Sequence, residues 1–92
     1  MKFVSTWSMR KATIPEAVRR FLAGGGKPPA GVKLLGRWHR SDASGGFSLY
    51  ETSDPAALFA HAAEWAPYLE IHTSMVLEDE EVGPVLARLY GQ

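Results

Sequence analysis

Hydrophobic and polar residues alternate along part of the chain, as they do in strands that bury one face. The segments with this pattern are residues 1–8, 31–39, 46–52 and 69–77. Aromatic and β-branched residues, which favour strands, are frequent in them. Between the second and third segments, residues 40–45 contain Ser, Asp and Gly and favour a tight turn. The pattern therefore predicts four strands, with a hairpin in the middle of the chain.

In other segments, apolar residues repeat every three or four positions, as on the buried face of a helix. These segments are residues 13–26, 53–65 and 78–90. Their apolar stripes are Ile14, Ala17, Val18, Phe21 and Leu22 in the first, Leu58, His61, Ala62 and Trp65 in the second, and Val82, Val85, Leu86 and Leu89 in the third. We therefore expect three helices.

Local signals indicate where two of these helices begin and end. Thr13 and Glu16 have the spacing of a capping box, and Gly24 suits a left-handed helix end. Asp54 is positioned to cap the second helix. The sequence does not determine the residue at which the third helix begins, because a Gly-Pro pair interrupts its pattern.

The order strand, helix, strand, strand, helix, strand, followed by a terminal helix, is typical of a ferredoxin-like α+β sandwich. We expect residues 1–92 to form a single domain, because a chain of 92 residues has room for only a small core. One antiparallel sheet would carry helices on one face. The other face would be bare and partly apolar, and a small domain commonly buries such a face against a second copy. We therefore expect a homodimer.

Composition limits the kinds of partner and the cellular location that we expect for this protein. Ten basic and ten acidic residues cancel, so no net positive field favours nucleic acid. The chain has no cysteine, which is compatible with a reducing compartment and excludes disulfides and thiolate chemistry. Because we find no leader-like apolar core and no run of about 20 apolar residues, we expect a cytoplasmic protein without a membrane partner.

Four quoted segments resemble a known family. They are "LLGRWH", "GFSLYET", "DPAALFAHAAEW" and "MVLEDEE", and the resemblance covers most of the chain. Together they resemble the proteins grouped as domain of unknown function 3303. The resemblance implies a small protein of the dimeric α+β barrel superfamily, which includes cofactor-free monooxygenases, lactone isomerases and haem-degrading enzymes. It implies no particular reaction for this chain.

Strand alternation separates the consecutive residues Arg37, Trp38 and His39. If Trp38 pairs with Phe47 across the hairpin, one sheet face carries an apolar row and the other a polar group. These two sets are Leu34, Gly36, Trp38, Phe47, Leu49 and Glu51 on one face, and Arg37, His39, Ser48 and Tyr50 on the other. His72 lies on a different strand and could join the second set. A slip of one residue would exchange the partners. We expect Trp38 to be buried and to matter for folding, and Arg37 and His39 to matter for recognition.

The polar group contains the candidate catalytic residues. His39 or His72 is a candidate general base near neutral pH, and Tyr50 a candidate proton donor or acceptor. Arg37 is suited to stabilising an anionic substrate or a developing oxyanion. The competing interpretation is that these residues form hydrogen bonds between strands or solvate a dimer interface.

The candidate ligand-binding residues are Arg37, His39, Trp7, Trp38 and Glu51. The two tryptophans could stack on a planar ligand, although aromatic residues on strands most often fill a core. Glu51, a carboxylate in an apolar row, either pairs with a cation, lines a wet pocket or lies at the sheet rim.

No metal or cofactor is expected. The three histidines are scattered, and no H-E-x-x-H motif is present, although one histidine could still hold a haem or a single metal ion. His61 lies on a helix stripe and is interpreted as a packed or interfacial residue. The segment "AGGGK" lacks the context of a phosphate loop, and no G-x-S-x-G elbow is present.

Three functional hypotheses remain. The first is a homodimer that binds a small apolar or aromatic molecule in a pocket between the sheet and the helices. The second is a cofactor-independent enzyme of the monooxygenase or isomerase kind, which rests on superfamily analogy alone. The third is a purely structural homodimer. A cavity lined by Glu51, a tryptophan and a histidine would favour the first two.

Overall fold

A computed structural model describes residues 1–91 and contains one four-stranded sheet. The strands are β1 (Lys2–Met9), β2 (Val32–His39), β3 (Gly45–Thr52) and β4 (Leu69–Val76), in the order β2-β3-β1-β4 with antiparallel neighbours. The helices are α1 (Ile14–Arg20), α2 (Pro55–Trp65) and α3 (Asp79–Tyr90), with a 3₁₀ turn at Lys11–Thr13 and a π turn at Phe21–Gly25. The predicted α+β class is confirmed, and the arrangement is compatible with a ferredoxin-like fold.

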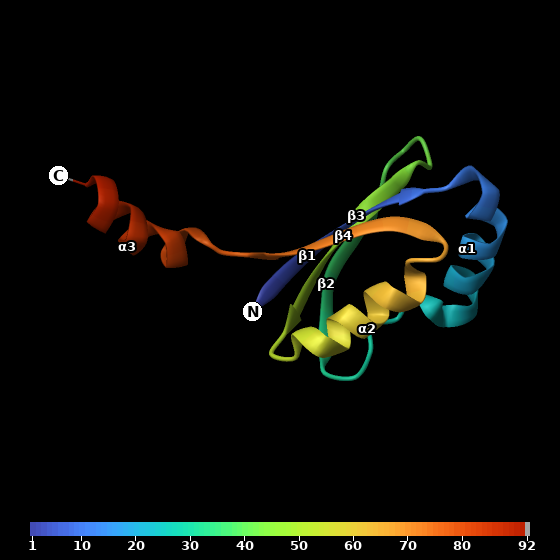
Figure 1. Cartoon of the computed structure of the whole chain (residues 1–92), viewed down its shortest axis with the longest axis horizontal. Helices are drawn as coiled ribbons and strands as arrows, with labels where there is room; N and C mark the ends of the chain where they lie inside the picture. Colours follow the sequence, from blue (N-terminus) through green and yellow to red (C-terminus); the bar gives the residue numbers. More distant parts are fainter. Residues whose placement is uncertain (92) are drawn as a thin grey trace.

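Helices α1 and α2 lie on the same face of the sheet, which we call the covered face (Figure 1). Two small apolar clusters join them to it. One contains Phe3, Val32, Tyr50 and Leu58, and the other contains Ala17, Trp65 and Leu69. The first cluster packs α2 on the strands, and the second packs α1 against α2 and β4.

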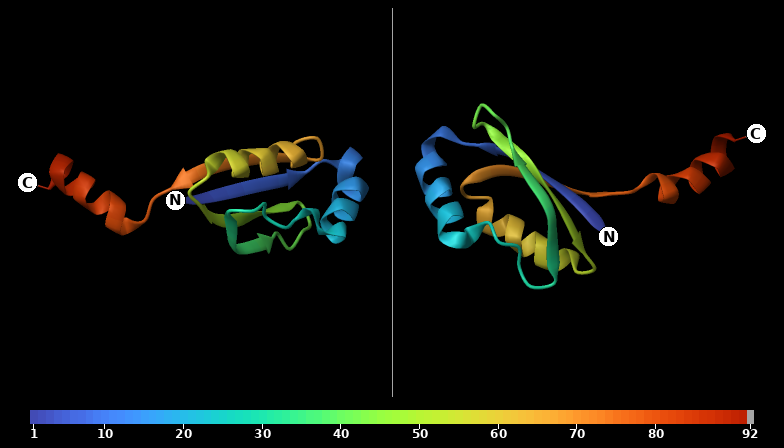
Figure 2. Two further views of the ribbon diagram at one scale, coloured as in Figure 1. Left: turned by 90° about the horizontal axis from the view of Figure 1, so that it is seen from below. Right: turned by 180° about the vertical axis from the view of Figure 1, so that it is seen from behind.

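No helix of residues 1–91 lies over the opposite face of the sheet, here called the open face (Figure 2). Trp38 pairs with Phe47 across the hairpin, as predicted, and their rings stack there with centroids 5.0 Å apart. The expectation that Trp38 is buried is wrong for this chain alone, because 52% of the residue is exposed.

A β-bulge at Leu35 changes the predicted faces of β2. Leu34 pairs with Tyr50, whereas Gly36 pairs with Leu49, so one extra residue lies between the two pairs. Leu34 therefore faces the covered side with Tyr50. Its predicted place in the row of Trp38 is wrong, while the rest of that row is confirmed.

The helix ends agree only in part with the local signals. Gly24 adopts a positive φ of 97°, as predicted, and the Asp54 carboxylate accepts a hydrogen bond from the Ala57 amide at 3.3 Å. The predicted capping box at Thr13 is wrong. The Thr13 hydroxyl donates to the carbonyl oxygen of Tyr68 at 2.8 Å, and this contact joins α1 to the turn before β4.

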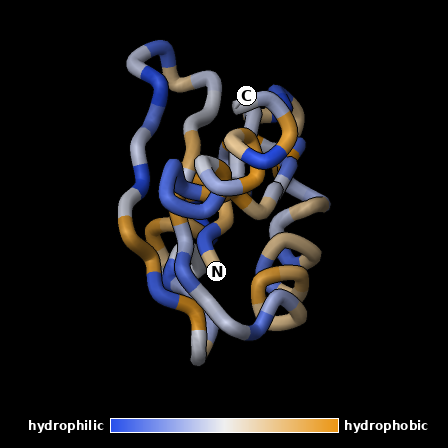
Figure 3. The backbone as a smooth tube through the Cα atoms, turned by 90° about the vertical axis from the view of Figure 1, so that its left-hand side faces the viewer, coloured by the Kyte–Doolittle hydropathy of each residue, from blue (hydrophilic) through white to orange (hydrophobic). Residues whose placement is uncertain are grey.

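Helix α3 projects from the sheet at the end of an extended segment (Figure 1). Glu78 caps it through a capping box with Glu81, and the Glu78 carboxylate pairs with the Lys2 ammonium at 3.0 Å. The helix contains no buried residue, and Val85, Leu86 and Leu89 of its predicted apolar stripe are exposed in the single chain. Viewed from the α3 end, hydrophobic and hydrophilic positions alternate along the tube of this helix (Figure 3). Within residues 1–91, no helix is both long enough and apolar enough to cross a membrane.

Candidate functional site

A cavity of about 430 Å³ lies between the covered face of the sheet and the helices. Side chains from all four strands, from α1 and its following π turn, and from α2 line it. Its volume falls within the range of about 300–1,000 Å³ that is usual for small-molecule sites. The cavity is therefore large enough to hold a ligand.

Most of the cavity wall is apolar and aromatic. Its aromatic members are Trp7, Phe21, His39, Tyr50, His61 and Trp65. The Trp65 indole nitrogen donates to the Gly25 carbonyl oxygen at 3.0 Å, which fixes α2 to the segment that follows α1. The result is a pocket with flat aromatic surfaces on several sides.

Arg37 is held in place at the pocket wall by three contacts. Its Nε donates to the Ser48 hydroxyl at 3.3 Å, and its Nη2 donates to the Gly26 carbonyl oxygen at 2.5 Å. The guanidinium also lies over the Phe21 ring, 5.4 Å from its centroid. No carboxylate of residues 1–91 lies within salt-bridge distance of it. Its charge is thus positioned without an acidic partner.

His39 lies at the rim of the pocket between two aromatic rings. Its ring meets Trp7 and Phe21 edge to face, at centroid distances of 5.6 and 5.7 Å. The residue is exposed, so one part of the ring contacts the aromatic wall while the other meets solvent. His39 therefore lies at the solvent-exposed edge of the pocket.

His61 and Tyr50 are buried polar residues that line the pocket. They are only 8% and 3% exposed, and their rings meet edge to face at 6.2 Å. Burial lowers the pKa of His61 from its ordinary value of 6.5; the nearby charge of Arg37 lowers it further, and Glu64 opposes the shift. His61 is consequently held neutral near physiological pH.

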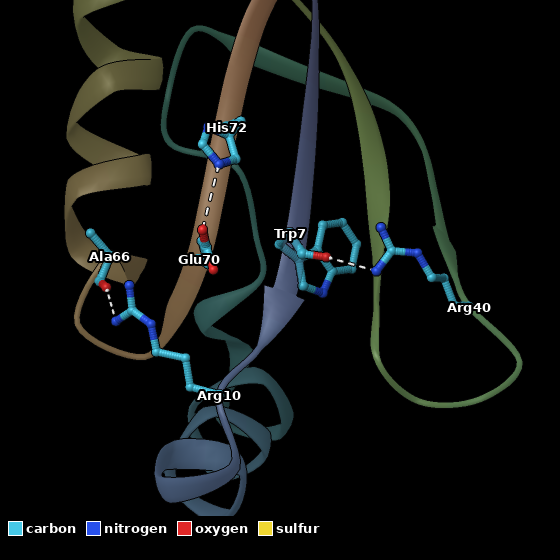
Figure 4. Close-up of polar contacts among 6 residues, drawn as sticks. All are labelled: Trp7, Arg10, Arg40, Ala66, Glu70 and His72. Carbon is cyan, nitrogen blue, oxygen red and sulfur yellow. Dashed lines mark hydrogen bonds and ion pairs between the residues drawn. The ribbon is translucent and has the colours of Figure 1, made fainter.

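The pocket wall carries positive charge and no acidic side chain. Two arginines, Arg37 and Arg40, line it, and no Asp or Glu of residues 1–91 does so. Arg40 lies in the hairpin turn, where its Nη1 donates to the Trp7 carbonyl oxygen at 3.5 Å (Figure 4). The chain has no net charge, so the positive pocket is a local feature.

Figure 4 also shows Arg10 donating to the Ala66 carbonyl oxygen at 3.0 Å, which joins the end of β1 to the end of α2.

The structure separates the predicted site residues between the two faces. Arg37, His39, Tyr50 and Trp7 line the pocket, whereas Trp38 and Glu51 lie on the open face. Glu51 lies opposite Lys2 and Lys33 in the strand register, but it forms no salt bridge within residues 1–91, and it does not line the pocket.

His72 does not join the polar group of Arg37. Because Thr6 is its partner on β1, His72 lies on the open face, where it is 3.9 Å from Glu70 (Figure 4). Its predicted placement with Arg37 is wrong. Within residues 1–91, no group of three or more His, Asp or Glu side chains is arranged to hold a metal ion.

Sequence reasoning did not identify His61, Phe21 and Trp65 as pocket residues. All three lie on predicted helix stripes, a signal that indicates burial but not whether the buried side chain meets protein or a cavity. The unusual position of a histidine in the stripe of α2 was the one signal that could have directed attention there.

Acid is expected to destabilise the protein partly through His61. Its pKa is lower in the folded chain than in the unfolded chain, so the unfolded state binds the extra proton first as the pH falls below 6.5. Stability should therefore begin to fall at about pH 7 and fall further as the pH drops below 6.5. Urea unfolding curves across this range, compared between wild type and His61→Gln, measure the effect, which should be smaller in the variant.

The matched control is His72→Gln, which removes a histidine whose side chain is 76% exposed. This variant should keep the acid sensitivity of the wild type. Equal acid sensitivity in the wild type and His61→Gln would contradict the interpretation of His61.

The fold and the cavity define a small α+β protein with a ferredoxin-like arrangement and a largely aromatic pocket on the helix-covered side. The family model described as Domain of unknown function (DUF3303) matches residues 1–90, and the chain belongs to this family. No curated protein matches the chain.

Proposed function

We propose that the chain binds a small, mainly apolar molecule in the pocket between the sheet and helices α1 and α2. The observation that carries the proposal is the set of polar groups in this aromatic cavity. Tyr50 and His61 line the cavity, and neither forms a side-chain hydrogen bond within residues 1–91, although each residue as a whole is more than nine-tenths buried. No buried side-chain nitrogen or oxygen in these residues lacks a hydrogen-bond partner, so the polar atoms of Tyr50 and His61 are accessible from the cavity. A ligand that carries hydrogen-bonding groups would pair with these accessible atoms inside an otherwise apolar pocket, which is the usual arrangement of a small-molecule site.

A thermal-shift screen of aromatic and aliphatic compounds tests this proposal, with Val18→Trp as the blocking variant. Val18 lines the pocket and is 42% exposed, so a larger side chain there would obstruct the cavity without entering a tight core. Val85→Trp is the matched control, because Val85 has the same 42% exposure but lies on α3. A ligand should raise the melting temperature of the wild type and Val85→Trp, and raise that of Val18→Trp much less.

Two results would count against the proposal. If no compound stabilises the wild type, the pocket is not a binding site for the classes screened. If Val18→Trp responds as strongly as Val85→Trp, the ligand binds elsewhere.

A second candidate function is a cofactor-independent enzyme that uses the same pocket. Neutral His61 beside the Tyr50 ring favours it, because a buried neutral imidazole is suited to accept a proton from a bound substrate. Mass spectrometry of a bound compound after incubation with wild type and His61→Gln distinguishes the two functions. Conversion by the wild type alone would indicate an enzyme, and recovery of the unchanged compound from both proteins would indicate a binding protein.

We also propose that the chain forms a homodimer through the open face. The Trp38–Phe47 stack supports this, since both residues are about half exposed on a face that no helix of residues 1–91 covers. The apolar stripe of α3 supports it too, because a helix of 12 residues is marginal in water without packing. Burial against a second copy would remove both apolar surfaces from solvent.

Light scattering after gel filtration at tens of micromolar protein should give the mass of a dimer for the wild type. Phe47→Glu should give a monomer, because it would place like charges in the centre of the interface. Phe59→Glu is the control, since Phe59 is 75% exposed on α2, away from the open face. A wild-type monomer would contradict the dimer and would also exclude a purely structural homodimer.

A further inference from the structure

We infer that the ligand of the pocket is an aromatic carboxylate, whose charged group pairs with Arg37 and whose ring lies among the aromatic side chains. This inference rests on the proposed binding function and names the chemical class of its ligand. It is carried by the position of Arg37, the charge of the pocket wall and the shape of the surrounding rings.

The Arg37 guanidinium is held in a fixed position and has no acidic partner within residues 1–91, so it is suited to bind an anion. Two of its nitrogens are used by Ser48 and Gly26, which leaves Nη1 without a hydrogen-bond partner in residues 1–91. Its contacts with a strand, a loop and the Phe21 ring fix the guanidinium before any ligand arrives. A guanidinium fixed in this way matches the planar geometry of a carboxylate, and charge-assisted hydrogen bonds of this kind are strong.

The surroundings of Arg37 leave its charge uncompensated within the pocket. No acidic side chain of residues 1–91 lines the cavity, and Arg40 adds a second positive charge at the hairpin end. Two acidic residues act from outside the cavity: Asp42 interacts with Arg40, and Glu64 affects His61, but neither lines the cavity. A partly buried charge in an apolar wall is costly without a counter-ion, so an anionic ligand would be favoured over a neutral one of the same shape.

The aromatic wall selects the body of the ligand. His39 meets both Trp7 and Phe21 edge to face, and Trp65 lies on the α2 side of the same cavity. Flat rings pack favourably against such surfaces through offset stacks and edge contacts. Tyr50 and neutral His61 remain available to hydrogen-bond a further oxygen of the ligand.

Isothermal titration calorimetry of the full chain with naphthoate and naphthamide tests the inference. The two probes share the ring and differ in charge. Naphthoate should bind the wild type about 10- to 100-fold more tightly, which is the range expected for hydrogen bonds to a charged group. High salt should weaken naphthoate binding and leave naphthamide binding nearly unchanged.

Variants assign the preference to one side chain. Arg37→Met should remove the advantage of naphthoate, whereas Arg37→Lys should retain part of it, because it keeps the charge and loses the planar geometry. Lys33→Met is the control: it removes one positive charge from the open face and should leave both affinities unchanged. Circular dichroism establishes whether each variant is folded, and the comparison of the two probes on the wild type remains decisive if Arg37→Met unfolds.

The outcomes separate this inference from the proposed function. Equal affinity of both probes, or a preference that survives in folded Arg37→Met, would overturn the anionic ligand while leaving a binding pocket. If neither probe binds but a neutral compound from the thermal-shift screen does, the inference also fails and the proposed function stands. If no probe and no compound binds, the proposed function itself fails.

Discussion

Trp65→Ala is expected to lower the free energy of unfolding by about 3–5 kcal/mol, the usual cost of removing a large buried aromatic side chain. Trp65 is 8% exposed and packs with Ala17 and Leu69, so it joins α1, α2 and β4. Its indole nitrogen also donates a hydrogen bond to the Gly25 carbonyl oxygen. In a domain this small, the loss would be a large part of the total stability. Urea unfolding followed by far-UV circular dichroism measures it.

Trp38→Ala is the matched control for the same chemical change on the other face. Because Trp38 is 52% exposed, its loss should cost the folded chain clearly less than the loss of Trp65. The comparison is made at a protein concentration at which light scattering finds a monomer, so that association does not contribute. If Trp38→Ala proved the more damaging variant, the assignment of the core to the covered face would be wrong.

Gly46→Ala is expected to destabilise the chain by about 1–3 kcal/mol, the usual cost of forcing extra volume into a packed region. A Cβ atom at position 46 would lie 2.1 Å from the Trp38 carbonyl oxygen and 2.8 Å from the Trp7 ring. The first of these neighbours is backbone of the paired strand, so strand β2 would have to shift. Chemical denaturation of the purified variant gives the change.

Gly83→Ala makes the same substitution where there is free space. No atom lies within 4 Å of a Cβ built at this glycine in α3, and alanine is the better helix former by about 0.5–1 kcal/mol. This variant should be neutral or slightly more stable. Equal losses of stability in Gly46→Ala and Gly83→Ala would show that contact with the Trp38 backbone is not what destabilises Gly46→Ala.

Sequence periodicity was sufficient for the elements and for most of the sheet. Alternation located the strands, and apolar stripes located the helices, because both signals are local. The bulge at Leu35 could not be predicted in this way, since a single extra residue leaves no mark in hydrophobicity. The failure of the predicted capping box at Thr13 could not be foreseen either, because the Thr13 hydroxyl is hydrogen-bonded to Tyr68, which is distant in sequence.

The candidate site was predictable only where the alternation of side chains along a strand determines which residues share a face. Alternation correctly grouped Arg37 and His39 with Tyr50, but could not show which face the helices cover. Trp38 was therefore assigned to a core that lies on the other side of the sheet. His72 was misplaced for a related reason, since its face depends on pairing with β1, far away in the sequence.

The distribution of the three tryptophans gives the protein two separate optical reporters. Trp7 and Trp65 line the pocket, whereas Trp38 lies on the open face against Phe47. With Trp38 replaced by phenylalanine, the remaining indole emission would come only from the pocket and would respond to quenching by a bound ligand. The difference in emission between the wild type and this variant would follow the polarity around Trp38 on the open face, and Trp65 stays in the core in both proteins. Occupancy of the cavity and contact between copies of the chain could then be followed independently, without an attached dye.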